Sequence, residues 1–312
     1  MTANPRVQVL LSTFNGAKFI DEQLHSLLIQ QGVEVSVLIR DDGSQDDTVE
    51  RIRHLAERHP AQITLLRADN RKLPFSFMEL IRLTSNTADY YAFCDQDDIW
   101  EQGKLARAVA MLQSRDPNRP LLYCSSTTLV DRNLNVLGKG PSVPNRCLTL
   151  QNALLENVAI GCTCVFNNCA LSLVKKHLPR QYDRIVMHDW WLYLSVSAFG
   201  EVVYDKESYI LYRQHSASTV GGSVNAIGQW KKRVRKYVGG KMSHVHTRQA
   251  SKFIECYESE LNPRFQEEIR RFIDSQQQGW GARLAYALSS PLYRQSALDN
   301  LVYKLLILLG KA

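Results

Sequence analysis

The first third of the chain alternates short apolar runs with stretches whose apolar residues recur every three or four positions. A short apolar run predicts a buried strand, and the longer spacing predicts a helix that buries one face. Four strands are expected at 7–11, 35–39, 63–66 and 90–94, with helices at 19–28, 47–55 and 77–83. Such alternation predicts an α/β fold with a mainly parallel sheet and helices on both faces, because each helix carries the chain back to the start of the next strand.

Polar side chains follow three of these predicted strands. Residues 12–16 follow the first strand, residues 41–44 the second and residues 95–98 the fourth. In open sheets of parallel strands, ligands bind beyond the carboxyl ends of the strands. The three strand ends therefore predict a polar binding site along one edge of the sheet.

Residues 95–98, Asp-Gln-Asp-Asp, place three carboxylates within four positions. Carboxylates this close repel one another, and a divalent cation with oxygen ligands removes the repulsion. The same cation can neutralise a departing diphosphate. The alternative is a solvated acidic turn that caps the following helix. The position of the cluster directly after an apolar strand favours a metal site.

Asp41 and Asp42 have two interpretations. Gly43 permits a tight turn, and Asp46 to Thr48 can cap the next helix, which would make the segment structural. Asp41 and Asp42 directly end a strand, however, where a carboxylate can accept hydrogen bonds from a base N–H or a ribose hydroxyl. Both interpretations can hold for different residues.

The remainder of the chain is less regular. Strands are expected at 121–125, 128–137 and 161–166, and a buried helix is expected at 188–199. Residues 223–312 are expected to form a basic helical region, with a boundary at 221–223.

The charge is unevenly distributed along the chain. Residues 1–222 carry 23 Lys and Arg against 24 Asp and Glu, whereas residues 223–312 carry 15 against 7, a net charge of +8. The segment 230–238 mixes five cations with aromatic and apolar residues, which suits an anionic membrane surface, or else a solvated helix face. The apolar segment 298–309 is too short to span a bilayer and can lie in the interface, dock on the preceding part of the chain or pair with another subunit. No nucleic-acid-binding motif is found, so a nucleic acid is not an expected partner.

The cysteines and the N-terminus bear on location. Seven cysteines, an odd number, and an N-terminus without the apolar run of a secretory signal predict reduced thiols in the cytoplasm. Cys162, Cys164 and Cys169 lie close together, but nothing nearby completes a zinc site, and we expect small buried residues. No stretch of 18 apolar residues occurs, so no membrane-spanning helix is expected. These features predict a cytoplasmic protein that can lie peripherally at the inner face of the cell membrane.

Five motifs together resemble the family 2 glycosyltransferases with the GT-A fold. They are Ser-Thr-Phe-Asn-Gly at 12–16, Asp-Asp-Gly-Ser at 41–44, Cys-Asp-Gln-Asp-Asp-Ile-Trp at 94–100, His-Asp-Trp-Trp at 188–191 and Tyr-Arg-Gln-His at 212–215. Each motif is weak alone, but their order and spacing over about residues 6–222 are specific. Two of the motifs, Asp-Gln-Asp-Asp-Ile-Trp at 95–100 and Tyr-Arg-Gln-His at 212–215, resemble most the bacterial rhamnosyltransferase-like branch, which serves polysaccharide and lipopolysaccharide assembly.

The resemblance implies a fold and a reaction. The fold would be a GT-A type, Rossmann-like sheet flanked by helices over 1–222, with a nucleotide-sugar half at about 1–115 and an acceptor half at about 116–222. Residues 223–312 would be a C-terminal helical extension. The reaction would be inverting and metal-dependent, using Mn²⁺ or Mg²⁺. It would move a sugar from a nucleotide-diphosphate donor onto a glycan or a lipid-linked saccharide acceptor.

The resemblance also assigns roles on the donor side. Thr13, Phe14 and Asn15 would contact the nucleotide, together with Asp41 or Asp42.

Metal and catalytic roles follow from the later motifs. Asp95 would contact the ribose or the metal, and Asp97 would be the main carboxylate for the cation. His215 would help to hold the metal or the diphosphate, and Asp189 would be the catalytic base. Family members often carry Asn three residues after this histidine, whereas this chain has Ser218.

The chemistry agrees with these roles. An inverting transfer needs a base for the acceptor proton and positive charge on the departing diphosphate, which Asp189 and a metal at Asp97 would supply. Alternatively, Asp189 is a helix N-cap and His215 a structural histidine. Three tryptophans could stack on sugar faces or fill the core: Trp100, Trp190 and Trp191.

The donor and two other classes of protein stay open. The rhamnosyltransferase-like motifs make dTDP-L-rhamnose the first choice of donor, and UDP-hexoses come next. A nucleotidyltransferase would need a basic, glycine-rich phosphate loop, but residues 12–16 hold one glycine and no arginine. A non-catalytic carbohydrate-binding protein would be expected to lack the acidic residues that are present here.

Overall fold

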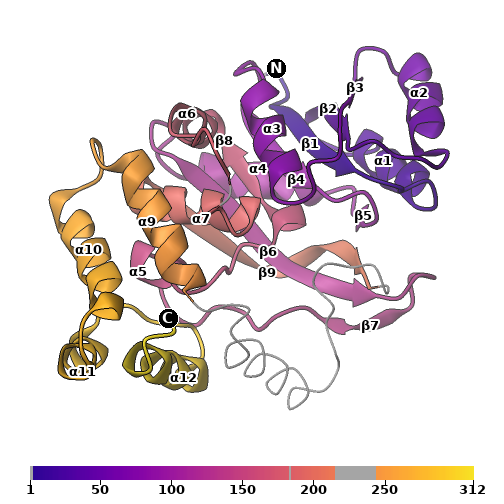
Figure 1. Ribbon diagram of the computed structural model, residues 1–312. Coiled ribbons are helices and arrows are strands. Elements are labelled where there is room, and N and C mark those ends of the chain that lie inside the picture. The colour runs from indigo at the N-terminus through magenta and orange to yellow at the C-terminus, as the bar shows by residue number, and fades with distance from the viewer. Residues whose placement is uncertain (1–2, 183, 215–243) are drawn as a thin grey trace.

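A computed structural model describes residues 3–182, 184–214 and 244–312. Its strands form one nine-stranded sheet in the order β3-β2-β1-β4-β8-β6-β9-β5, with β7 paired to β6 (Figure 1). Helices pack on both faces of this sheet, which confirms the predicted α/β class and its GT-A-like arrangement.

The first half of the sheet is parallel, as predicted. It consists of β1 (Arg6–Thr13), β2 (Glu34–Asp41), β3 (Ile63–Arg67) and β4 (Tyr90–Cys94). The connecting helices are α1 (Ile20–Leu28), α2 (Thr48–Arg58) and α3 (Phe75–Leu83). In register, Thr13 lies beside Asp41, and Leu11 lies beside Cys94. The three polar loops therefore leave the same edge of the sheet.

The second half of the sheet is mixed, and two predicted strands were wrong. The segment expected as one strand at 128–137 is divided between β6 (Leu121–Val130) and β7 (Val136–Lys139). The turn between them forms because the Asp131 carboxylate accepts hydrogen bonds from the backbone of Asn133 and Asn135. The segment expected at 161–166 is instead the 3-10 helix η1 (Gly161–Thr163) followed by β8 (Val165–Asn167).

Two strands that the apolar pattern did not indicate complete this half. β9 (Glu201–Arg213) runs parallel to β6. β5 (Ile99–Trp100) follows the acidic loop and pairs with the end of β9. The helices of this half are α4 (Lys104–Gln113), α5 (Leu150–Ala153), α6 (Asn168–Lys176) and the predicted α7 (His188–Phe199).

The described part of the C-terminal region is helical, as predicted. It contains α9 (Val245–Tyr257), α10 (Pro263–Gln277), α11 (Trp280–Ser289) and α12 (Ala297–Leu308). Of these helices, α9 lies beside α7 (Figure 1), and the apolar residues of all four belong to the same core as α7 and β4. The predicted boundary at 221–223 and the basic segment 230–238 lie outside the described residues.

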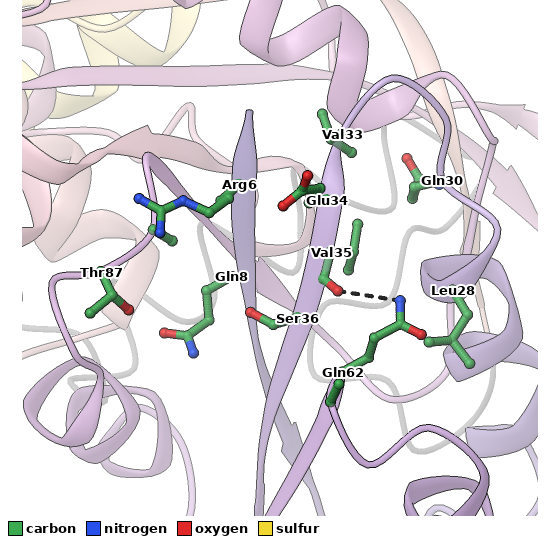
Figure 2. A pocket seen from close by; sticks show the side chains of 12 residues that line it. Arg6, Gln8, Leu28, Gln30, Val33, Glu34, Val35, Ser36, Gln62 and Thr87 are labelled. Carbon is green, nitrogen blue, oxygen red and sulfur yellow. Dashed lines mark hydrogen bonds between the residues drawn. The ribbon is translucent and has the colours of Figure 1, made fainter. Parts of the chain in front are cut away.

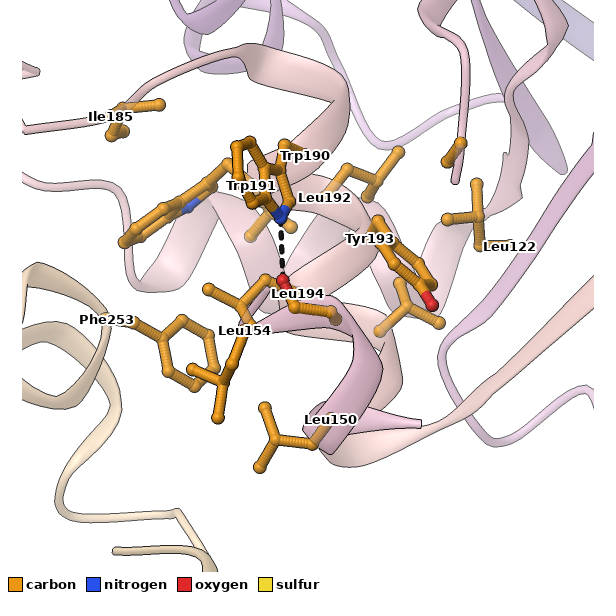
Figure 3. Close-up of a cluster of buried hydrophobic side chains, with 14 of the residues drawn as sticks. Leu122, Leu150, Leu154, Ile185, Trp190, Trp191, Leu192, Tyr193, Leu194 and Phe253 are labelled. Atoms are coloured by element: carbon orange, nitrogen blue, oxygen red, sulfur yellow. Dashed lines mark hydrogen bonds between the residues drawn. The ribbon is translucent and has the colours of Figure 1, made fainter. Parts of the chain in front are cut away.

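The tryptophans fill the core. Trp190, Trp191 and Trp100 are all buried, and the ring of Trp191 meets that of Phe253 edge to face at 5.8 Å (Figure 3). The indole N–H of Trp190 donates to the carbonyl of Ala153 at 2.6 Å. Their packing inside the protein favours the core interpretation over stacking on a sugar.

The cysteines were expected to be reduced, and no helix was expected to span a membrane. All seven cysteines are free, and Cys162 and Cys164 are buried. Among the described residues, no helix is both long enough and apolar enough to cross a membrane.

Candidate active site

The loop after β1 is held in place by a single glutamine of the acidic motif. The Gln96 side-chain oxygen accepts from the Thr13 hydroxyl at 2.8 Å and from the Phe14 backbone N–H at 2.9 Å. Its amide group donates to the Phe14 carbonyl at 3.2 Å. A Cβ at Gly16 would lie 2.2 Å from the Gln96 oxygen, so only glycine leaves room for this side chain. Gln96 therefore holds Asp95 and Asp97, its sequence neighbours, against the loop predicted to contact the nucleotide.

The loop after β2 is fastened to the same place. The Asn15 backbone N–H donates to the Ser44 hydroxyl at 2.9 Å, and the Asn15 side chain accepts from the backbone N–H of Gln45 at 2.9 Å. Gly16 donates to the Thr48 hydroxyl at 2.8 Å. Within this framework the Phe14 side chain remains 44% exposed, so an aromatic face is open to solvent at the rim of the site.

Asp41 and Asp42 are both buried and both have partners within the chain. Asp41 accepts hydrogen bonds from the backbone N–H of Gly43 and Ser44 and from the Ser44 hydroxyl. Asp42 pairs with Arg40 and accepts from the backbone N–H of Lys72 at 2.9 Å. The turn interpretation accounts for these contacts, and contact of either carboxylate with a nucleotide stays a prediction.

The acidic loop brings two carboxylates and one thiol together. The ligand atoms of Asp95, Asp98 and Cys162 all lie within 4.8 Å of one another. Burial, with the charges of Asp97 and Asp189, raises the pKa of Asp95 to about 7. Burial and the neighbouring carboxylates raise the pKa of Asp98 well above its usual value. The pKa values are raised because neighbouring negative charges repel one another in a buried place. A bound cation would remove this repulsion, so the site favours a cation.

A buried lysine lies beneath this loop. Lys104 is 1% exposed, and its Nζ lies 3.3 Å from the centroid of the Trp100 ring, a cation–π contact. Burial lowers the pKa of Lys104 to about 8. The favourable interaction between Lys104 and Asp98 offsets part of the negative charge of the cluster.

Arg213 fastens the end of β9 to the acidic loop. Its backbone N–H donates to the Asp98 carboxylate at 3.0 Å, and its guanidinium donates to the carbonyls of Asp97 and Arg132 at 2.8 and 2.7 Å. A third guanidinium contact, at 2.7 Å, reaches Glu22. The residues that follow β9 therefore start from a fixed point beside the acidic cluster.

The predicted base lies at the start of α7. Asp189 is 7% exposed, and its carboxylate oxygens accept from the backbone N–H of Trp190 at 2.6 Å and of Gly161 at 2.9 Å. Burial raises the pKa of Asp189 to about 6 despite these bonds. A Cβ at Gly161 would lie 2.9 Å from the His188 ring, so glycine permits this close approach.

His188 provides a neutral, rigid support for the start of α7. Its ring stacks on Phe77 at 3.8 Å and meets Phe93 edge to face at 4.9 Å. Burial lowers the pKa of His188 to about 3, so the ring is uncharged at neutral pH and does not pair with the adjacent Asp189.

Two consecutive residues join the base to the acidic cluster. Gly161 donates to Asp189, and the thiol of Cys162 lies among the atoms of Asp95 and Asp98. The charge of Asp189 also acts on Asp95. A carboxylate suited to proton transfer and a carboxylate cluster suited to a cation are thus parts of one site.

Most of the predicted site residues meet at the carboxyl edge of the sheet. The loop at 12–16, the motif at 95–98 and Asp189 are brought together, whereas His215 and Ser218 lie outside the described residues. Four further residues of this site had no predicted role, namely Gln96, Lys104, Cys162 and Arg213. Gln96 and Arg213 lay within recognised motifs, and the other two carried no local signal.

A separate hollow lies at the opposite edge of the sheet. It has a volume of about 490 Å³ and is lined by residues from the beginnings of β1 and β2, including Arg6, Gln8 and Glu34 (Figure 2). Gln62 donates to the Val35 carbonyl across one side of it, at 3.4 Å. Because none of the acidic loop residues lines it, this hollow is not part of the candidate active site.

The fold is shared with two solved structures of known proteins. The chain is similar to the crystal structure of S. aureus TarS 1–349 in complex with UDP-GlcNAc, with a TM-score of 0.58, 15% identity and coverage of 92% of this chain and 82% of that one. It is also similar to the mannosyltransferase PcManGT from Pyrobaculum calidifontis in complex with GDP-Man and Mn²⁺, with a TM-score of 0.51, 19% identity and coverage of 98% and 81%. Both likenesses show that the protein has the GT-A fold.

The sequence comparisons agree with this fold. Residues 8–134 match glycosyl transferase family 2, and this match together with the relative named next makes the protein a glycosyltransferase. It is 29% identical to the dTDP-rhamnosyl transferase RfbG of Shigella flexneri, over 71% of this chain and 77% of that protein.

We expect the Arg213 contacts to matter for stability. Arg213→Met leaves the carbonyls of Asp97 and Arg132 without their buried donor, so the free energy of unfolding should fall by about 2–4 kcal/mol. Thermal or urea unfolding measures the change. Arg115→Met is the matched control, because Arg115 pairs with Glu201 at an exposed position, where an ion pair contributes less than about 1 kcal/mol. Equal effects of the two substitutions would contradict the anchoring role.

Proposed function

We propose that this protein is an inverting, metal-dependent glycosyltransferase in which Asp189 is the general base. The observation that carries the proposal is the junction of Asp189 with the acidic cluster through Gly161 and Cys162. A carboxylate whose pKa is raised to about 6 is ionised at neutral pH, yet it is a stronger base than an exposed aspartate.

The reaction follows from these positions. The acceptor hydroxyl oxygen would attack the anomeric carbon while its proton passes to a carboxylate oxygen of Asp189. The bond between the anomeric carbon and the diphosphate oxygen would break, and the diphosphate would leave with the electron pair. The exposed Phe14 ring offers a stacking surface for the nucleotide base, and Gln96 holds this loop next to the acidic motif.

The residues present fit a divalent cation. Asp95 and Asp97 are half-buried carboxylates, and Asp98 and Cys162 are buried beside Asp95. Hard cations such as Mg²⁺ and Mn²⁺ prefer the carboxylate oxygens, and we propose that Asp95 and Asp97 hold the cation with His215. A bound Mn²⁺ or Mg²⁺ would supply positive charge to the departing diphosphate.

Donor binding should depend on the metal. A carboxylate cluster without a cation repels a diphosphate, so EDTA should weaken donor binding and abolish turnover, and added Mn²⁺ should restore both. Isothermal titration with donor and a transfer assay, each with and without EDTA, measure the two effects. Unchanged affinity together with full activity in EDTA would exclude the metal site.

For the donor we propose dTDP-L-rhamnose. Support comes from the rhamnosyltransferase-like motifs at 95–100 and 212–215 and from the similarity to the dTDP-rhamnosyl transferase RfbG. The similarity in fold to TarS, bound to UDP-GlcNAc in its crystal structure, keeps UDP-hexoses as the second candidate. A thermal-shift screen of nucleotide sugars should show the largest stabilisation with dTDP-rhamnose. Turnover with a UDP-hexose alone, without binding or competition by dTDP-rhamnose, would reject this choice.

As acceptor we propose a glycan or a lipid-linked saccharide of bacterial polysaccharide or lipopolysaccharide assembly. The rhamnosyltransferase-like motifs support this choice. The catalytic domain would be 1–222 and would divide near residue 115 into donor and acceptor halves. In support, the donor loops all precede residue 115, whereas Gly161 and Asp189 follow it.

A further inference from the structure

Helix α12 presents a row of leucines to solvent. Leu298, Leu301, Leu305 and Leu309 recur at intervals of three and four residues, which places them on one stripe of the helix. Each is at least half exposed, from 50% for Leu305 to 63% for Leu309. Neighbouring α11 exposes two more large apolar side chains, Trp280 and Leu288. We call the four leucines of α12 the leucine stripe.

The leucine stripe belongs to a well-packed helix. The opposite side of α12 buries Tyr303, Leu306 and Ile307 in the core shared with α7. A Cβ at Gly310 would lie 2.4 Å from the Arg283 guanidinium, so Arg283 of α11 covers the end of α12. The stripe therefore remains exposed even though α12 is docked, because its apolar residues occupy both sides of the helix.

The charges beside the stripe are mainly positive. Residues 279–312 contain one acidic residue, Asp299, and four basic ones, Arg283, Arg294, Lys304 and Lys311. Arg294 is largely buried and pairs with Glu156, so the cations that can border the stripe are Arg283, Lys304 and Lys311. Lys304 directly precedes Leu305 in sequence, and Lys311 follows Leu309 by two positions.

We propose that the leucine stripe docks this enzyme on the surface of an anionic lipid bilayer. An apolar stripe bordered by cations is the pattern of a helix that lies in the membrane interface, with leucines in the acyl region and lysines at the headgroups. A second copy of the chain fits less well, because a two-fold contact would bring like charges such as Lys304 together. The stripe is also short for a stable dimer, which needs roughly 20–30 residues on each side.

Docking of this kind would serve the proposed function, on which it partly rests. A lipid-linked acceptor is confined to the membrane surface, and an enzyme held there meets it without diffusing from bulk solution. The sequence allowed residues 298–309 to lie in the membrane interface, to dock within the chain or to pair with another subunit. The proposal combines the first two, because one side of α12 packs within the protein and the other side would contact lipid.

Vesicle flotation with the full chain tests the proposal. The protein should float with phosphatidylcholine vesicles that contain phosphatidylglycerol, and less with phosphatidylcholine alone. The double variant Leu301→Gln/Leu305→Gln should bind the anionic vesicles at least about tenfold more weakly than the wild type. The matched control is Leu83→Gln/Leu137→Gln, which changes two leucines of similar exposure, 49% and 47%, elsewhere on the surface, and should float like the wild type.

Each other outcome overturns the proposal. These outcomes are a wild type that fails to float and a stripe variant that floats as well as the control. A fall in melting temperature confined to the stripe variant would show that the leucines pack within the protein. A dimer that becomes a monomer in the stripe variant, by light scattering, would make the stripe a subunit interface. Flotation requires neither donor nor turnover, so an enzyme that floats without transferring sugar would contradict the proposed function alone.

Discussion

Asp189→Asn should lower sugar transfer by about 10²–10⁴, the usual contribution of a positioned general base. The asparagine side chain cannot take up a proton at neutral pH, whereas the donor contacts lie elsewhere in the site. Donor affinity should therefore stay close to that of the wild type. A transfer assay together with a donor titration separates the two quantities.

The pH dependence provides a second measurement of the same residue. A general base acts in its deprotonated form, so kcat/KM of the wild type should fall as the pH drops through about 6, the raised pKa of Asp189. Residual activity of Asp189→Asn should lack this acidic limb. An unchanged acidic limb in the variant would assign it to another group.

Stability separates catalysis from the role of Asp189 at the start of α7. Asparagine has one acceptor oxygen for the N–H groups of Trp190 and Gly161, which costs about 1 kcal/mol. It also removes a buried charge whose ionisation the fold disfavours, so the net change in stability should be small. Asp189→Ala loses both bonds and should be less stable. Near-normal turnover of the Asn variant beside a destabilised Ala variant would make Asp189 a structural residue.

Asp97→Asn should lower turnover by about 10²–10³, because it removes a carboxylate proposed to hold the cation at the departing diphosphate. Excess Mn²⁺ should recover part of the activity if the loss is one of metal affinity. Asp47→Asn is the matched control, since Asp47 is an exposed aspartate in the neighbouring loop. Asp98→Asn should be measured beside it. A loss of metal affinity in Asp98→Asn but not in Asp97→Asn would move the cation to Asp95, Asp98 and Cys162.

How much of this site could be predicted depends on how local each signal is. Asp95 and Asp97 follow an apolar strand directly, so their place at the sheet edge is readable from a short stretch of sequence. The same sequence allowed Asp41 and Asp42 either a turn or a ligand. Only the structure shows that their oxygens already accept hydrogen bonds within the chain.

Strand β9 shows where sequence patterns become insufficient. The polar run of Asp205, Lys206 and Glu207 interrupts its apolar residues, so no strand is expected there. β6 supplies parallel pairing along one side, and the register shifts near Ser125 and Ser126 accommodate the interruption. Pairing with a strand about eighty residues away thus overrides the local pattern.

By itself, the sequence determined the parallel half of the sheet and the edge that carries the polar loops, and it contained the motifs that resemble family 2 glycosyltransferases. The periodicity of a strand and the residues at its end are local properties, so they can be read from a short stretch of sequence without knowledge of the fold. The tertiary structure alone decided that Gln96 clamps the loop after β1, that Cys162 lies among the carboxylates and that Lys104 lies beneath them. It also decided which leucines of α12 face solvent. These contacts join residues far apart in the chain, and their existence depends on packing that no single segment encodes.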